Sequence, residues 1–136
     1  MIKLEVQTHQ RTDFIDVTSL IAGAVKKLNV VDGVVTVFVP HTTAAITINE
    51  GSDPDVVTDM SKSLNRIVPW EDGYLHAEGN AAAHIKASFF GSSVSVIVAG
   101  GRLQLGTWQV IWFCDFDGPR HRHLWVQAIT GAAAHS

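Results

Sequence analysis

The sequence predicts an α+β fold, because strand-like segments lie toward both ends of the chain and helical segments lie between them. Strands and helices do not alternate regularly, whereas regular βαβ alternation would indicate a doubly wound parallel sheet. A chain near this length hides roughly 70% of its unfolded surface on folding, so it can form a hydrophobic core unaided. Residues 1–136 contain no repeat or linker and are expected to form a single domain.

The N-terminal segment is expected to form two strands followed by a helix. Residues 2–7 alternate between apolar and polar side chains, as a half-buried strand does, and residues 14–17 are the expected hairpin partner. Thr18 or Ser19 is expected to cap the helix. Its apolar stripe consists of Leu20, Ile21, Ala24, Val25 and Leu28.

The remaining strands are expected in the middle and in the last third of the chain. Residues 34–39 form a β-branched run that is apolar on nearly both faces, which is typical of a central strand. Residues 43–48 are the next expected strand. The last third contains four more, at residues 94–98, 103–105, 108–113 and 124–129.

Two further helices are expected between these strands. Asp53 and Pro54 mark the beginning of one, because a carboxylate can accept a bond from a free backbone N–H and proline is tolerated at the first helical position. Asn80 is expected to cap the other, over residues 81–90, which Gly91 ends. The expected buried stripe of the former helix consists of Val56, Met60, Leu64 and Ile67.

Charge and cysteine content narrow the possible partners and location. The net charge is −3 and there is no basic run, so no nucleic-acid partner is expected. No stretch approaches the roughly 20 apolar residues of a membrane span, and the N-terminus does not resemble a secretion signal. Cys114 is the only cysteine and lies in an apolar run, so we expect a buried core residue. We therefore expect a cytoplasmic protein without a membrane partner.

Three histidines lie where the chain changes direction and could share a metal ion. His41 follows an expected strand, His76 lies in a polar loop, and His84 lies in the first turns of the third helix. Imidazole binds transition metals such as zinc, and three histidines leave the open coordination position that a catalytic metal requires. Surface or capping roles are the alternative. His121 and His123 share a strand face, but two histidines without a nearby third ligand bind a metal poorly.

Other polar residues are candidates for catalysis or substrate binding. Glu50 and Glu78 lie in loops beside glycine or asparagine, where a carboxylate can act as a general base or remain in solvent. Residues 100–109 are rich in glycine, which permits close approach to a ligand but also forms hairpins. Arg102 could bind a phosphate or a carboxylate there, or remain exposed. Residues 117–120 are expected to form a tight turn.

Five segments, in order and covering nearly the whole chain, resemble the blocks of the YjbQ-like family, whose family name is secondary thiamine-phosphate synthase. They are residues 41–50 (HTTAAITINE), 64–69 (LNRIVP), 76–86 (HAEGNAAAHIK), 101–109 (GRLQLGTWQ) and 115–120 (DFDGPR). The resemblance implies an α+β, β-sandwich-like fold with mixed sheets and about three helices. It also implies a homotrimer, with these blocks gathered in a pocket near the subunit contacts.

The resemblance assigns roles to residues in these blocks. His41, His76 and His84 are the expected metal ligands, and Glu50 or Glu78 is the expected general base or orienting residue. The expected substrate-binding residues are Asn49, Asn80, Arg102, Thr107 and Gln109.

The activity that the resemblance implies is thiamine-phosphate synthesis, which joins a pyrimidine diphosphate to a thiazole phosphate. Such a reaction requires a divalent cation, usually Mg²⁺, to neutralise the leaving diphosphate. A histidine-rich pocket suits Zn²⁺ or another transition metal instead. The expected ligand is a small phosphorylated metabolite. The alternatives are a metal-dependent hydrolase and a non-catalytic trimer that binds a metal or a metabolite.

Overall fold

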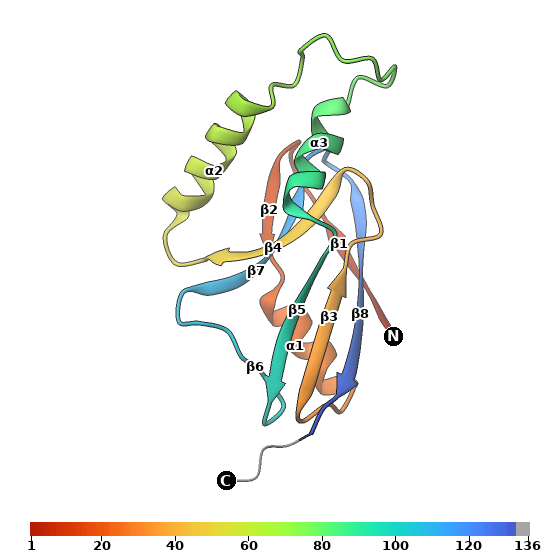
Figure 1. Ribbon diagram of the computed structural model, residues 1–136, viewed down its shortest axis with the longest axis vertical. Coiled ribbons are helices and arrows are strands. Elements are labelled where there is room, and N and C mark those ends of the chain that lie inside the picture. Colours follow the sequence, from red (N-terminus) through yellow and green to blue (C-terminus); the bar gives the residue numbers. More distant parts are fainter. Residues whose placement is uncertain (133–136) are drawn as a thin grey trace.

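The computed structural model describes residues 1–132; the last four residues of the expected domain, 133–136, lie outside the described residues. Within residues 1–132, three helices accompany two sheets whose strand pairs are all antiparallel, so the predicted α+β class is confirmed and the sheets are not mixed (Figure 1). The order is β1-β8-β3-β5-β6 in the larger sheet and β2-β7-β4 in the smaller. The elements are β1 (Ile2–Gln7), β2 (Asp13–Asp16), α1 (Thr18–Lys27), β3 (Gly33–Phe38), β4 (Ala44–Glu50), α2 (Pro54–Ile67), α3 (Ala81–Phe90), β5 (Ser93–Ala99), β6 (Arg102–Leu103), β7 (Gln109–Asp115) and β8 (His121–Thr130).

The predicted hairpin between the first two strands is wrong. β1 pairs with β8, whereas β2 pairs with β7 in the other sheet. The connection between them follows the loop from β7 to β8, because Thr8 N donates to Arg120 O and Gly118 N donates to Arg11 O. Residues 8–12 therefore carry the chain from one sheet to the other instead of turning it back.

The main core lies between the larger sheet on one side and α1 with the smaller sheet on the other. Val35 and Val37 of β3 point inward together with Val126 of β8. Ile21 of α1 and Ile46 of β4 meet them, and all five side chains are fully buried. The alternation along β3 thus places every second valine in this core.

The opposite face of the smaller sheet is covered by α3. Ala45 of β4 and Cys114 of β7 pack there against Ala83 and Ala87, and Phe116 completes the cluster. The small side chains allow the helix to lie close to the sheet. Burial raises the pKa of the Cys114 thiol well above its ordinary value, so the predicted core role of this cysteine is confirmed.

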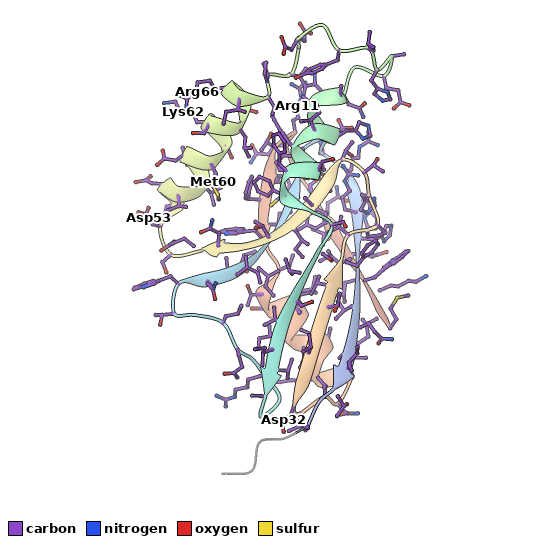
Figure 2. The ribbon with its side chains drawn as sticks, viewed as in Figure 1. Arg11, Asp32, Asp53, Met60, Lys62 and Arg66 are labelled. Atoms are coloured by element: carbon purple, nitrogen blue, oxygen red, sulfur yellow. The ribbon has the colours of Figure 1, made fainter. Side chains whose placement is uncertain are left out.

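α2 begins as predicted but is not buried as predicted. Asp53 accepts a hydrogen bond from Asp55 N at 2.9 Å and Pro54 is the first helical residue. Among the described residues, however, none in α2 is fully buried, and Ile67 is 67% exposed. Figure 2 shows the helix running along one side of the molecule from Asp53 to Arg66. No helix in the described part of the chain is long and apolar enough to cross a membrane.

The predicted helix caps at Thr18, Ser19 and Asn80 are also corrected. Within residues 1–132, neither Val17, which precedes α1, nor Asn80, which precedes α3, makes a side-chain capping bond. The Thr18 hydroxyl instead donates to Asp16 and accepts from Ile111 N, which ties α1 to the smaller sheet.

A buried ion pair joins the two sheets. Arg122 of β8 donates to both carboxylate oxygens of Asp115 of β7, at 2.7 and 3.0 Å, and the two side chains are only 6% and 0% exposed. Arg122 also donates to Thr43 Oγ1 at 2.8 Å, and Thr8 Oγ1 donates to Asp115 at 2.7 Å. Asp117 N donates to the same carboxylate. Four chain segments therefore meet at one charge pair.

The outer face of the larger sheet carries exposed apolar side chains. Val34 and Phe38 of β3 are each 40% exposed, Ile97 of β5 is 64% exposed and Ile129 of β8 is 73% exposed. These residues alternate along the strands with the buried valines. Both the inward-facing and the outward-facing positions of these strands therefore carry apolar side chains. Val34, Ile97 and Ile129 lie side by side in the strand register, and an exposed apolar patch of this kind is typical of a surface covered by another chain.

We predict a homotrimer in which this face is covered. Light scattering at micromolar concentration should give three times the chain mass of 14.7 kDa. Ile97→Glu should shift the mass toward the monomer because it would place a charge in an apolar contact. Lys27→Glu, which changes an exposed residue at the end of α1, should leave the mass unchanged. A wild-type monomer would show that the apolar face remains in solvent.

We predict that Asp115→Asn lowers the free energy of unfolding by about 3–5 kcal/mol, because it leaves the buried Arg122 charge unpaired. Urea unfolding measures this change, with the exposed Asp59→Asn on α2 as a control expected to cost less than about 0.5 kcal/mol. A double variant, Asp115→Leu with Arg122→Met, should be more stable than the single variant. A loss below about 1 kcal/mol in Asp115→Asn would contradict the prediction.

Candidate functional site

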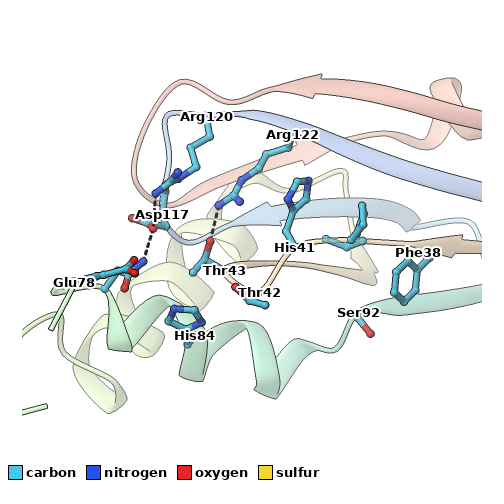
Figure 3. A pocket seen from close by; sticks show the side chains of 13 residues that line it. Phe38, His41, Thr42, Thr43, Glu78, His84, Ser92, Asp117, Arg120 and Arg122 are labelled. Atoms are coloured by element: carbon cyan, nitrogen blue, oxygen red, sulfur yellow. Dashed lines mark hydrogen bonds and ion pairs between the residues drawn. The ribbon is translucent and has the colours of Figure 1, made fainter. Parts of the chain in front are cut away.

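A pocket of about 570 Å³ lies where the segment after β3, the beginning of α3 and the loop from β7 to β8 meet (Figure 3). Figure 3 shows Glu78 and His84 on one side of it and Arg120 on the other. A second hollow of about 540 Å³ adjoins it at His41 and His84. The polar side chains of the first pocket that matter for chemistry are His41, Glu78, Asn80, His84, Asp117 and Arg120.

His41 is held as a neutral ring with a defined tautomer. Its Nε2 accepts a hydrogen bond from His123 N at 2.9 Å. Burial, followed by the nearby positive groups Arg122 and His123, lowers the pKa of His41 below 6.5. The proton of the neutral ring therefore lies on Nδ1. His41 can thus donate a hydrogen bond to a ligand through Nδ1.

The loop from β7 to β8 positions Arg120. Arg120 Nη2 donates to Asp117 Oδ2 at 3.0 Å and its Nε donates to Asp117 O at 2.9 Å. Gly118 permits this conformation, because a Cβ there would overlap the Gln10 carbonyl oxygen and the Thr8 hydroxyl. An arginine has five N–H donors, and these two bonds use two of them. The Arg120 side chain is 54% exposed, and its guanidinium keeps donors for a ligand.

Asn80 contributes an acceptor without a partner. Its Nδ2 donates to Asp117 Oδ2 at 2.9 Å. A carboxylate can only accept, so this bond fixes which end of the amide is the oxygen. In the described part of the chain, Asn80 Oδ1 is buried and has no hydrogen-bond partner. A buried unsatisfied acceptor is costly, which is often a sign of a functional site.

The structure brings the three predicted metal ligands near one another without joining them. The rings of His76 and His84 lie at 86° with centroids 5.1 Å apart, and His76 Nε2 is 3.9 Å from Glu78 Oε2. His41 and His84 line the same pocket. Within residues 1–132, however, the three histidines do not form a group whose ligand atoms all lie within 4.8 Å of one another. His41 Nε2 is also already occupied.

Of the other predicted site residues, Asn49, Glu50 and Gln109 lie at the opposite end of β4 and β7, where Glu50 pairs with Gln109, and Thr107 lies just before β7. Arg102 lies in β6 of the larger sheet, opposite Ala99 of β5. The Glu50 carboxylate accepts hydrogen bonds from Ser52 N and Asp53 N, so it closes the turn into α2. Gln109 Oε1 accepts from Gly106 N at 2.8 Å. Of the described residues that line the pocket, none belongs to the set Asn49, Glu50, Arg102, Thr107 and Gln109.

Sequence reasoning missed Asp117 and Arg120 as site residues. Their segment was interpreted as a tight turn, and it does connect β7 to β8. The signal that could have identified them is charge, because a turn needs small or flexible residues but does not need an acidic and a basic side chain three positions apart.

Comparisons with known proteins agree over nearly the whole chain. The family described as UPF0047 protein YjbQ-like matches residues 2–131. UPF0047 protein MJ1081 of Methanocaldococcus jannaschii is 43% identical over 95% of this chain and 94% of its own length. UPF0047 protein YugU of Bacillus subtilis is 46% identical over 91% of this chain and 95% of its own length.

Solved structures show the same fold. A YjbQ/UPF0047 family protein from Clostridium acetobutylicum is 49% identical and superposes with a TM-score of 0.93, over 95% of this chain and all 100% of its own. The protein APE1520 of Aeropyrum pernix is 34% identical and gives a TM-score of 0.90, over 95% of this chain and 97% of its own. The chain therefore belongs to the YjbQ-like family of UPF0047 proteins.

Proposed function

We propose that this protein is an enzyme that acts on a small phosphorylated metabolite bound in the pocket between α3 and the loop from β7 to β8. The observation that carries the proposal is the convergence of two donors on one cavity. Arg120 has guanidinium N–H groups that are not used in its bonds to Asp117, and His41 presents Nδ1–H. Phosphate oxygens accept several hydrogen bonds at once and favour arginine in particular.

Both arginines of the pocket are paired with carboxylates, so an anionic ligand would be held by the unused N–H donors of Arg120 and not by a net positive charge. Arg122 lies behind the pocket, and its charge is paired with Asp115. Arg120 is a half-exposed cation at the opening of the pocket. Asp117 orients it by accepting two hydrogen bonds from its guanidinium group. A volume of about 570 Å³ lies within the range of sites for small metabolites.

The opposite side of the pocket offers groups for acid–base chemistry. Glu78 is 76% exposed and lies near His76, and His84 projects from the first turns of α3. A carboxylate and an imidazole across from a phosphate-binding arginine can remove and return a proton on the bound metabolite. We propose thiamine-phosphate synthesis as the reaction: the ring nitrogen of a thiazole phosphate forms a bond to the methylene carbon of a pyrimidine diphosphate, the bond from that carbon to the diphosphate oxygen breaks, and diphosphate leaves with no net loss of a proton.

The metal cofactor expected from the sequence is a prediction, and the pocket offers different ligands to different metal ions. A Zn²⁺ ion would take imidazole ligands, for which His76 and His84 are the adjacent pair. A Mg²⁺ ion, which the synthase reaction requires, would take oxygen ligands, and the pocket holds the carboxylates of Glu78 and Asp117. Because His41 Nε2 accepts a backbone hydrogen bond, His41 does not fit a metal in this conformation. The roles proposed here for Arg120, His41 and Glu78 are those of the side chains, and a bound Mg²⁺ ion would supply the neutralisation of the leaving diphosphate.

We predict that Arg120→Ala weakens the binding of inorganic diphosphate and of thiamine phosphate by at least about tenfold, because a charged hydrogen bond contributes about 1.5–3 kcal/mol. Isothermal titration calorimetry measures this loss. Arg66→Ala, an exposed arginine in the last turn of α2, is the matched control and should bind as the wild type does. Unchanged binding in Arg120→Ala would refute the pocket. Loss in Arg102→Ala alone would instead favour the glycine-rich hairpin as the phosphate site.

We predict that the wild type forms thiamine phosphate from the two phosphorylated precursors in the presence of Mg²⁺, and that Glu78→Gln forms at least about a hundredfold less. Product formation and diphosphate release are measured together. Release of phosphate from one precursor alone would indicate a hydrolase. Binding of the precursors without turnover would indicate a non-catalytic metabolite-binding protein, and either outcome would overturn the synthase assignment.

A further inference from the structure

We propose that Glu5, His121 and His123 form a binding site for a divalent transition-metal ion on the outer face of the larger sheet, at the beginning of β8 and therefore at the opposite end of that strand from the exposed apolar residue Ile129. This site lies outside the pocket described above and does not depend on the proposed function. In residues 1–132 it is the only group of three or more histidine, cysteine or acidic side chains whose ligand atoms all lie within 4.8 Å of one another.

The strand register assembles the three ligands. β1 and β8 are antiparallel, with Glu5 opposite His123 and Gln7 opposite His121. Side chains two residues apart on a strand share a face, and directly opposite residues of neighbouring strands share it too. Two imidazoles from β8 therefore stand beside one carboxylate from β1. The strands are the rigid support that a metal site requires.

The distance between the first two ligands fits a shared ion. His121 Nε2 lies 3.3 Å from Glu5 Oε1. Two ligands at about 2.1 Å from a zinc ion, separated by a tetrahedral angle, lie about 3.4 Å apart. A direct N–H···O hydrogen bond has its usual length at about 2.9–3.0 Å. The observed spacing therefore suits two ligands on one edge of a coordination polyhedron, and it also suits an ion pair between a protonated His121 and Glu5.

Gln7 determines which nitrogen of His121 faces Glu5 as a ligand. Gln7 Nε2 donates to Thr8 O and Arg120 O, both at 3.1 Å, so its Oε1 is the atom that lies 3.3 Å from His121 Nδ1. An amide oxygen can only accept, so Nδ1 carries the proton of the neutral ring. In the neutral ring the Nε2 lone pair faces the Glu5 carboxylate, so either a proton or a metal cation can bridge the two side chains. A metal-ligating histidine commonly has its other nitrogen hydrogen-bonded in this way.

His123 is positioned by the neighbouring segments. Its backbone N–H is bonded to His41, and the two rings stack at 23° with centroids 5.9 Å apart. The ring of His121 lies edge-on, with its centroid 5.3 Å from that of His123. Two imidazoles with one carboxylate favour Zn²⁺, Ni²⁺, Co²⁺ or Cu²⁺ over Mg²⁺ and Ca²⁺. Three protein ligands leave further coordination positions for water.

The test is a titration of the full chain, stripped of metal with a chelator and dialysed, with Zn²⁺ against a chromophoric competitor. Wild-type protein should bind one ion per chain. Glu5→Gln, His121→Ala and His123→Ala should each weaken binding by more than about tenfold, and the double variant His121→Ala with His123→Ala should bind no ion here. His9→Ala, an exposed histidine elsewhere, should bind like the wild type. Co²⁺ should give a visible absorption band that the double variant loses.

Two results would overturn the proposal. If the three single variants bind Zn²⁺ as the wild type does, the side chains form only an ion pair between His121 and Glu5. If His76→Ala or His84→Ala abolishes binding while these variants do not, the ion occupies the pocket instead. Diphosphate titration of the same variants separates this test from the proposed function. If the protein does not bind diphosphate, the zinc result is unaffected, and if it does not bind zinc, the diphosphate result is unaffected.

Discussion

The buried pair of Arg122 and Asp115 is the interaction on which the arrangement of the two sheets depends. One partner belongs to β8 of the larger sheet and the other to β7 of the smaller. The pair also orders Thr8 after β1 and Thr43 before β4. A buried charge pair is stabilised by further hydrogen bonds to its two members, and the two threonines and Asp117 N supply such bonds. The back of the pocket is therefore built from groups that cannot move independently.

Local patterns in the sequence were sufficient to predict individual strands and helices, but not which strands pair with one another. The bounds of β1 and α3 were predicted to the residue, because alternation and a terminal glycine are local signals. The partner of β1 is β8, from the far end of the chain, and no short-range pattern specifies that pairing. The stripe of α2 was identified by its period, yet Ile67 stays exposed because the coverage of a helix face is decided by what packs against it.

The candidate site was likewise only partly predictable from the sequence. His41 and His84 meet in one pocket, whereas Glu50 and Gln109 lie at the other end of the same strands and hold turns. A sequence block shows which residue types are present, but it does not show which of them lie close together. Residues at the two ends of a strand are separated by the whole length of that strand. The pair His121 and His123 was discounted for want of a third ligand. That ligand, Glu5, is supplied by the register of an antiparallel pair.

The position of β8 between β1 and β3 has a consequence for how the chain folds as it is synthesised. The larger sheet has its N-terminal strand at one edge, and that strand pairs with the last strand of the described chain. During translation β1 has no neighbour to bond until β8 leaves the ribosome. Closing a loop of nearly the full chain length is entropically slow, and topologies of this kind fold slowly for their size. Until that moment both edges of β1 are open to pairing with another chain, whereas in the folded protein β8 covers one of them.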